Sequence, residues 1–233
     1  MRRVATGWES ELTIAVDATI DAAGLSPLIA AFDRDNGGTR LRLTSEVLGG
    51  TWDALATRRA DLAVGAPGLP PPGGGWTLRP FGTLEFVFTV ASGHPLAAVA
   101  EPLTAQVLAP HRVIVLADTS RELLARSAGL TDRANTLTVA DMPSKLAAIV
   151  AGLGVGHLPR PLAEQQVAAG LIRIKRLTEP MPVVEQHLAW RTDHEGKALA
   201  WFVSRLTTPQ WRRNILGSGA AGKTAGIRRG VRK

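Results

Sequence analysis

The stretch that most constrains the fold runs from Leu12 to Asp33 and reads LTIAVDATIDAAGLSPLIAAFD. Its first part, Leu12–Val16, is a short apolar run that ends at Asp17, which is typical of a buried strand in an open sheet. After a polar turn, apolar residues recur with the spacing of one helix face, namely Leu25, Leu28, Ile29 and Phe32. The chain therefore begins with a strand, a polar turn and a helix.

The polar turn of this unit is a candidate binding element. In open α/β sheets, the carboxyl end of a strand and the N-terminus of the following helix face the ligand crevice. Asp17, Thr19 and Asp21 occupy that turn. We therefore expect these three residues to line a site.

Up to residue 65 the chain alternates strand, helix, strand, helix and strand, which predicts an α/β fold with a mainly parallel sheet. Strands are predicted at 39–46, 62–65, 76–81, 85–90, 112–116, 135–139, 155–158, 171–174 and 187–190. Helices are predicted after Thr51, after the capping-box sequence Thr119–Glu122, after Asp141 and after Gly196. Two such series, joined by strands near 85–91 and 186–191, predict two lobes with a double crossover. Residues 7–90 and 187–206 would form the first lobe, and residues 91–186 the second.

Composition excludes several classes of protein. Of the 233 residues, 45% are hydrophobic and 20% are charged, as in ordinary globular proteins. No apolar run approaches the roughly 20 residues that span a bilayer, and acidic residues follow Met1-Arg2-Arg3 where a signal peptide would be apolar. We therefore expect a cytoplasmic protein with no membrane association. The absence of cysteine excludes disulfides and zinc–thiolate sites.

The net charge of +7 belongs to the end of the chain. From residue 207 onward there are seven basic residues and no acidic one, so the remainder carries equal numbers of both. We expect residues 207–233 to form a basic, disordered tail. The neutral body does not support a nucleic-acid footprint on a folded face.

Several short sequence motifs, taken in order, are similar to those of one known family. They are RADLAVG in the first predicted lobe, SGHPLA at the start of the second, and GLGVGHLP after its last long helix. With LTIAVDATIDAAGLSPLIAAFD before them and GLIRIKRL after them, they make the chain from about Gly7 to Leu206 resemble the effector-binding domain of LysR-type transcriptional regulators.

The resemblance implies two Rossmann-like lobes with a periplasmic-binding-protein-like arrangement, a small-molecule effector bound between them, and no cofactor. It also implies a homodimer or homotetramer, whose rearrangement passes the effector signal to an N-terminal winged helix-turn-helix. That DNA-binding domain is absent from this sequence, so DNA contact is expected only through a domain outside it.

The resemblance places ligand contacts on the loops after the first strands of each lobe. The residues that match are Asp17, Thr19, Asp21, Glu46, Gly65, Thr119, Ser120, Asp141, Met142, His157 and Pro159. An alternative is that Asp21, Thr119 and Asp141 only cap helices, and that His157 is a packed core residue. Five acids near these loops (Asp17, Asp21, Glu46, Asp118 and Asp141) favour a donor-rich or cationic ligand over a multiply charged anion.

Other chemistries find little support in the sequence. The five histidines are scattered without metal-ligand spacing, so no metal is predicted. No nucleophile–base–orienter set indicates an enzyme, although a two-lobed enzyme remains an alternative. The sequence 217–224 matches G-x-x-x-x-G-K-[ST] by letter but lacks the strand and helix that a phosphate loop needs. An alternative interpretation of the fold is a two-lobed solute-binding protein that delivers a small molecule to a transporter.

Overall fold

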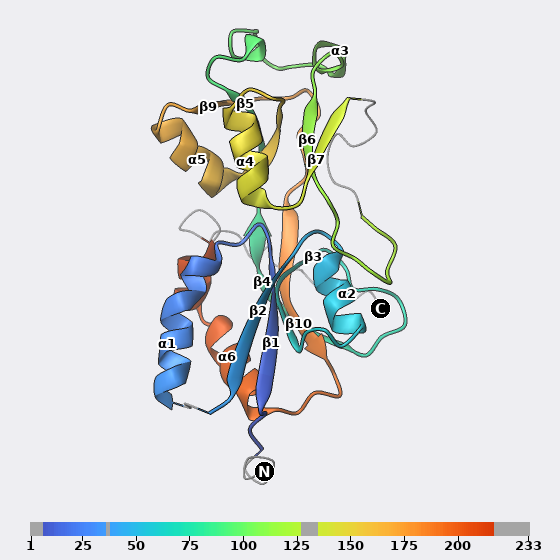
Figure 1. Cartoon of the computed structure of the whole chain (residues 1–233), viewed down its shortest axis with the longest axis vertical. Helices are drawn as coiled ribbons and strands as arrows, with labels where there is room; N and C mark the ends of the chain where they lie inside the picture. The colour runs from blue at the N-terminus through green and yellow to red at the C-terminus, as the bar shows by residue number, and fades with distance from the viewer. Residues whose placement is uncertain (1–6, 36–37, 127–134, 217–233) are drawn as a thin grey trace, which may run out of the picture.

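The computed structural model describes residues 7–35, 38–126 and 135–216, and it has two lobes stacked along the long axis of the molecule (Figure 1). The first lobe is built on a five-stranded sheet in the order β2-β1-β3-β10-β4. β1, β2 and β3 are mutually parallel, whereas β10 runs antiparallel to β3 and β4. The strands are Glu11–Asp17 (β1), Arg40–Glu46 (β2), Leu62–Pro67 (β3), Trp76–Leu84 (β4) and Val184–Arg191 (β10).

Alternation along β1 decides which helices cover each face of this sheet. Leu12, Ile14 and Val16 enter a large core with the helices of one face, and Ala15 enters a smaller core on the other. The face that bears the large core is covered by Ala22–Leu25 (η2), Ser26–Asp35 (α1), Lys197–Leu206 (α6) and Pro209–Leu216 (α7). The opposite face carries the short helix Gly50–Ala56 (α2), whose buried Trp52 packs among small alanines of the sheet. Figure 1 shows α1 and α6 on one side of the sheet and α2 on the other.

The second lobe is a mixed sheet covered by helices. β8, β5 and β9 pair antiparallel, and β6 and β7 pair parallel. The backbone of Val155 bonds to Arg112 and Ile114, so the two sheets continue into each other. The strands are Phe86–Ala91 (β5), Val113–Leu116 (β6), Thr136–Val139 (β7), Gly156–Pro159 (β8) and Ile172–Lys175 (β9). The helices are Pro95–Ala97 (η3), Ala105–Leu108 (α3), Met142–Val150 (α4) and Arg160–Ala168 (α5).

The chain crosses between the two sheets twice, and the crossings differ from the boundaries expected at residues 90 and 187. β5 pairs with β8 and β9 rather than with the first sheet, so the first crossing is at Glu85 and not at residue 90. The second crossing precedes Val184, where β10 begins. The position of each crossing follows from strand pairing. β4 ends at Leu84, which pairs with Val184, the first residue of its antiparallel partner β10.

The prediction of a disordered tail from residue 207 is wrong for its first part. Pro209–Leu216 forms α7, and Ile215 and Leu216 are buried in the large core of the first lobe. Gly82 in β4 leaves the space for Leu216, because a Cβ there would lie 2.3 Å from a Leu216 methyl carbon. Residues 217–233, including the G-x-x-x-x-G-K-[ST] sequence, lie outside the described residues.

Two further findings concern the described part of the chain. None of its helices has the length and apolar character needed to cross a bilayer. Within the same ranges, no group of three or more histidine, aspartate or glutamate side chains is placed to hold a metal ion.

Candidate functional site

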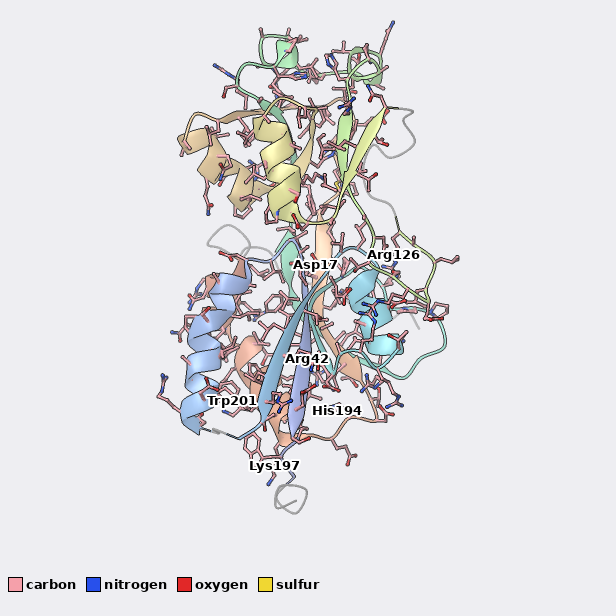
Figure 2. The ribbon with its side chains drawn as sticks, in the orientation of Figure 1. Asp17, Arg42, Arg126, His194, Lys197 and Trp201 are labelled. Carbon is pink, nitrogen blue, oxygen red and sulfur yellow. The ribbon has the colours of Figure 1, made fainter. Side chains whose placement is uncertain are left out.

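A cavity of about 250 Å³ lies where the two lobes meet. Its first-lobe wall comes from the end of β1, the turn after β2 and the start of β10, and its second-lobe wall comes from β6, α4 and β8. Apolar side chains make up most of the lining, including Val47, Leu48, Phe86, Val113, Ile114, Leu116, Met142 and Val184. A few polar groups converge on it from both lobes, which is the usual construction of a small-molecule site. Figure 2 shows Asp17 at the level where the lobes meet.

On the first-lobe side, a chain of hydrogen bonds ends at Asp17. The Thr19 hydroxyl and backbone N–H both donate to Asp17 Oδ1, and Gln186 Nε2 donates to the Thr19 hydroxyl at 2.9 Å. Asp17 is only 3% exposed. Burial raises the pKa of this carboxyl to about 6, although the two hydrogen bonds from Thr19 act in the opposite direction.

The same chain leaves one oxygen unsatisfied. Gln186 is 2% exposed and lines the cavity, and its Oε1 has no hydrogen-bond partner among the described residues. A buried polar atom without a partner is costly and calls for an explanation, such as a bound ligand. Gly65, in the adjacent strand β3, has φ +84° and lets Ile20 and Asp17 approach it closely, because a Cβ there would lie 2.3 Å from Ile20 Cδ1.

On the second-lobe side, Lys145 from α4 and His157 from β8 line the cavity. Desolvation lowers the pKa of Lys145 to about 8, and no hydrogen bond or ion pair of its ammonium occurs within the described residues. Desolvation, with the nearby charge of Lys145, lowers the pKa of His157 to about 4, so its imidazole is neutral at pH 7. The ring of His157 packs edge-on against Phe88, with the ring centroids 5.4 Å apart.

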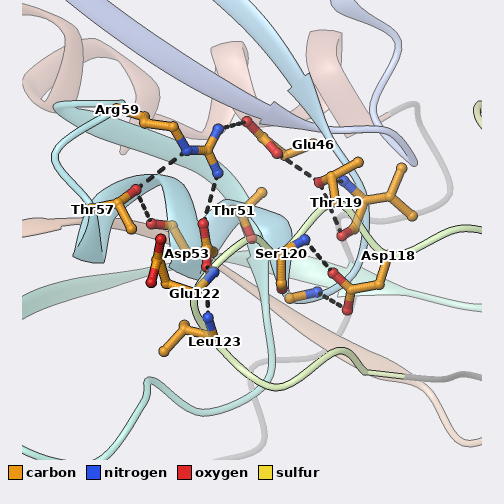
Figure 3. A network of polar contacts seen from close by, with 12 residues as sticks. Glu46, Thr51, Asp53, Thr57, Arg59, Asp118, Thr119, Ser120, Glu122 and Leu123 are labelled. Carbon is orange, nitrogen blue, oxygen red and sulfur yellow. Dashed lines mark hydrogen bonds and ion pairs between the residues drawn. The ribbon is translucent and has the colours of Figure 1, made fainter.

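The segment Asp118–Arg126, which we call the strap, follows β6 in the second lobe but binds the first lobe (Figure 3). Thr119 and Val47 are joined by hydrogen bonds, and Asp118 Oδ2 accepts from the N–H of Gly49. At the far end, the Arg126 guanidinium donates to the carbonyls of Pro67 and Leu69 and lines the cavity. The strap therefore contributes Arg126 to the cavity lining, and its hydrogen bonds to Val47 and Gly49 tie the lobes together.

A buried ionic cluster in the first lobe anchors the strap. Asp53 accepts from Arg59 at 2.8 Å and, at its other oxygen, from the N–H groups of Glu122 and Leu123, each at 2.8 Å. Arg59 also donates to Glu46, again at 2.8 Å. Burial alone would raise the pKa of Asp53, but the Leu123 N–H, the Arg59 guanidinium and the Glu122 N–H lower it to about 2. Thr119 completes the cluster by donating to Glu46 at 2.6 Å.

The sequence-based prediction of a helix beginning at Thr119–Glu122 is wrong. These residues form no helix, because their N–H groups and hydroxyl bond to the first lobe instead of capping a turn of their own. Gly50 in α2 makes room for the contact, since a Cβ there would lie 1.8 Å from the Thr119 hydroxyl. Ser120 lies in the strap with its hydroxyl buried and without a partner among the described residues.

The structure divides the residues predicted from the resemblance into three groups. Four of them, Asp17, Thr19, Met142 and His157, line the cavity. Asp21, Asp141 and Pro159 lie instead at a second hollow of about 570 Å³, where Thr19 and Met142 also contribute. The remaining four, Glu46, Gly65, Thr119 and Ser120, lie outside both linings and act on the strap or on the packing beside Asp17.

The alternative that some of these residues are caps is confirmed for two. The Asp21 carboxylate accepts from the N–H of Ala23 at the start of η2, and Asp141 accepts from the N–H of Ser144 at the start of α4. Thr119 is not a cap, because its hydroxyl bonds to Glu46 and Val47.

The structure does not support a predominantly acidic cavity. Glu46 is neutralised by Arg59, and Asp118 accepts from the backbone N–H groups of Gly49, Ser120 and Arg126. Of the five acids on which that prediction rested, only Asp17 lines the cavity. Two basic side chains also line the cavity, Lys145 from the second lobe and Arg126 from the strap.

Sequence reasoning missed Lys145, Gln186 and Arg126. A signal for Lys145 is present, because it lies on the same helix face as the buried Met142 and Ile149, where a solvated charge is unexpected. Gln186 and Arg126 carry no such local signal.

Replacing Asp17 by asparagine is expected to stabilise the unliganded protein by about 2–3 kcal/mol at pH 7. A carboxyl whose pKa is about 6 when folded and 3.8 when unfolded binds more protons in the folded state, so stability falls as pH rises between these values. The gain of Asp17→Asn over the natural sequence should therefore grow from pH 4 to pH 6 and then level off. Urea unfolding across pH measures it, and Asp33→Asn on the exposed side of α1 is the control. A constant difference at all pH values would contradict the assignment.

Comparison with known proteins identifies the family. The sequence model described as LysR substrate binding domain matches residues 5–209. The HTH-type transcriptional regulator YeeY of Escherichia coli is 37% identical over 214 residues, which cover 92% of this chain and 66% of YeeY. The HTH-type transcriptional regulator PunR of Escherichia coli is 33% identical over 205 residues, covering 88% of this chain and 66% of PunR. The chain thus spans about two thirds of the length of these relatives.

Solved structures agree on the fold. The regulatory domain of MetR, a LysR family regulator from N. meningitidis, superposes with a TM-score of 0.63 at 19% identity, over 90% of this chain and 94% of that one. The effector binding domain of QuiR, solved with shikimate, gives a TM-score of 0.60 at 17% identity, over 85% of this chain and 95% of that one. The chain belongs to the LysR substrate-binding domain family, the effector-binding part of LysR-type transcriptional regulators.

Proposed function

We propose that this chain senses a small metabolite in the cytoplasm, binding it in the cavity between the lobes, and controls transcription through a DNA-binding domain. The observation that carries the proposal is the cavity itself, in which apolar walls surround the buried Gln186 Oε1, an oxygen with no hydrogen-bond partner in the described part of the chain. A homodimer or homotetramer would relay the signal. Cofactors, metals and catalysis have no part in this proposal.

The strap supplies a route from ligand to lobe arrangement. Arg126 lines the cavity, and the same nine-residue segment is fastened to the first lobe by Asp53 and Glu46. A ligand that bonds to both walls would favour one lobe arrangement over others by its difference in affinity for them. A change in the fraction of molecules with each lobe arrangement would then alter the contacts between subunits of an oligomer.

The test begins with native mass spectrometry of the full chain after incubation with a bacterial metabolite extract and desalting. We expect a retained small molecule, and at about 100 times its dissociation constant it should raise the free energy of unfolding by about 2.7 kcal/mol. Val115→Phe, which fills the cavity, should abolish retention, whereas Val107→Phe on the distant helix α3 should not. If the natural protein retains no small molecule, the sensing role is contradicted. If Val115→Phe retains as much ligand as the natural protein, the placement of the ligand in this cavity is contradicted.

A further inference from the structure

The two walls of the cavity between the lobes offer opposite hydrogen-bonding chemistry. The first-lobe wall presents oxygen acceptors, namely the Asp17 carboxyl and Gln186 Oε1, to which no described residue bonds. The second-lobe wall presents the ammonium of Lys145, which has three donors and no partner within the described residues. Each set is unsatisfied or desolvated on its own, and the two sets belong to different lobes.

We propose that the ligand is two-ended, with an N–H donor group that faces Asp17 and Gln186 and a carbonyl or carboxylate oxygen that faces Lys145. This inference rests on the proposed function and specifies the chemistry of the same cavity. One ligand of this kind satisfies the orphan acceptor and the orphan donor together. A ligand with only one type of group leaves a buried polar atom unpaired on the opposite wall, which costs affinity.

The orientation of the ligand follows from how firmly each wall is held. Gln186 cannot turn its amide to offer a donor without breaking the hydrogen bond from its Nε2 to the Thr19 hydroxyl, which is itself held by Asp17. On the other wall, the stem of Lys145 lies against β8, with its Cε 3.4 Å from the place where a Cβ of Gly156 would be. Acceptors and donor are therefore preset before a ligand arrives.

The apolar lining limits the rest of the ligand. Val47 and Val184 from the first lobe and Ile114 and Met142 from the second surround the polar groups. Apart from its donor and acceptor groups, the ligand must be apolar, and it must be small enough for a cavity of about 250 Å³. An α-amino acid with an aliphatic side chain and a cyclic amide with adjacent N–H and C=O groups both meet this description, and they differ in carrying full or partial charges.

Matched probes separate these chemistries by calorimetry on the full chain. The amino-acid arm compares L-leucine with isoamylamine, which keeps only the donor, and 4-methylvalerate, which keeps only the acceptor. The cyclic-amide arm compares thymine with 1,3-dimethylthymine, which lacks the N–H groups. We expect binding in at least one arm, with every one-ended partner weaker by tenfold or more. The ligand retained from the metabolite extract is a third arm, identified by its fragmentation mass spectrum.

Variants assign the ends of the ligand. Lys145→Met should weaken the two-ended ligand by tenfold or more without lowering the melting temperature, because methionine fills the same apolar path without a buried charge. Lys197→Met, at the end of the first lobe away from Asp17 (Figure 2), is the matched control and should not change affinity. Gln186→Leu should likewise weaken binding by tenfold or more.

Three results would overturn the inference. The first is a one-ended amine or carboxylate that binds as tightly as its two-ended counterpart. The second is a ligand from the extract that has no N–H donor or has no carbonyl or carboxylate oxygen. The third is a Lys145→Met variant that binds the two-ended ligand with unchanged affinity. In each of these cases a ligand still binds the cavity, so the sensing role survives. Retention of no small molecule at all would overturn the sensing role and the ligand chemistry together.

Discussion

Replacing Asp53 by alanine is expected to lower the free energy of unfolding by about 3–5 kcal/mol, because it breaks a buried ion pair from one side. Asp53 is fully buried, and its loss leaves the Arg59 guanidinium with Glu46 as its remaining acid partner. The N–H groups of Glu122 and Leu123 would also lose their acceptor. Urea unfolding of Asp53→Ala measures the loss.

The matched control is Asp193→Ala, which removes an exposed carboxylate paired with Arg58 at 2.9 Å. Solvent screening makes such pairs nearly neutral, so we expect no measurable change there. Because the pKa of Asp53 is about 2 when folded and 3.8 when unfolded, its contribution is present above pH 4 and is lost as pH falls through 2. The difference between Asp53→Ala and the natural sequence should shrink accordingly.

A second readout of Asp53→Ala reports on the strap. Once its anchor is lost, trypsin should cleave after Arg121 or Arg126 faster than in the natural protein, at concentrations of urea where both remain folded. Equal unfolding energies for Asp53→Ala and Asp193→Ala, or equal cleavage rates in the strap, would contradict the role of this cluster.

Replacing Phe32 by alanine is expected to cost about 3–5 kcal/mol, the usual range for a large buried aromatic residue. Phe32 on α1 is completely buried and contacts three other aromatic rings, those of Trp8, Trp201 and Phe202, with centroid distances of 6.1, 5.0 and 4.9 Å. The cavity left behind would lie between α1 and α6, where rings from three parts of the chain meet. Neighbouring helices cannot fill it without shifting against the sheet.

Thermal and urea unfolding of Phe32→Ala measure this cost, with Leu69→Ala as the control because Leu69 is 79% exposed. We expect the control to unfold like the natural protein. Because Phe32 belongs to the first-lobe core and does not line the cavity between the lobes, Phe32→Ala should retain ligand affinity at temperatures where it is folded. A loss below 1 kcal/mol would show that α1 is not held by this aromatic group.

Periodicity and turn chemistry account for what was predicted correctly. The apolar run Leu12–Val16 became an interior strand of a sheet, and the stripe that includes Leu28 and Phe32 became the buried face of α1. Asp17 and Thr19 lie at the cavity because the end of a parallel strand opens there whatever the details of packing. These signals are local, so a single sequence carries them.

The errors share a cause, which is that each feature depends on a distant partner. The capping-box pattern at Thr119 is overridden by Asp53 and Glu46, roughly 70 residues earlier in the chain. The helix Pro209–Leu216 looks polar in sequence, but Ile215 and Leu216 are buried in the core of the first lobe, Trp211 packs against that core, and Leu216 lies beside Gly82.

The sequence by itself determined the class of fold, the order of its strands, and the turn that carries Asp17. Only the tertiary structure decided that Lys145 and Gln186, from different lobes, line one cavity with Asp17 between apolar walls. The physical reason is that hydrophobic periodicity reports which face of an element is buried, whereas the partners of a buried polar group depend on how separate elements pack.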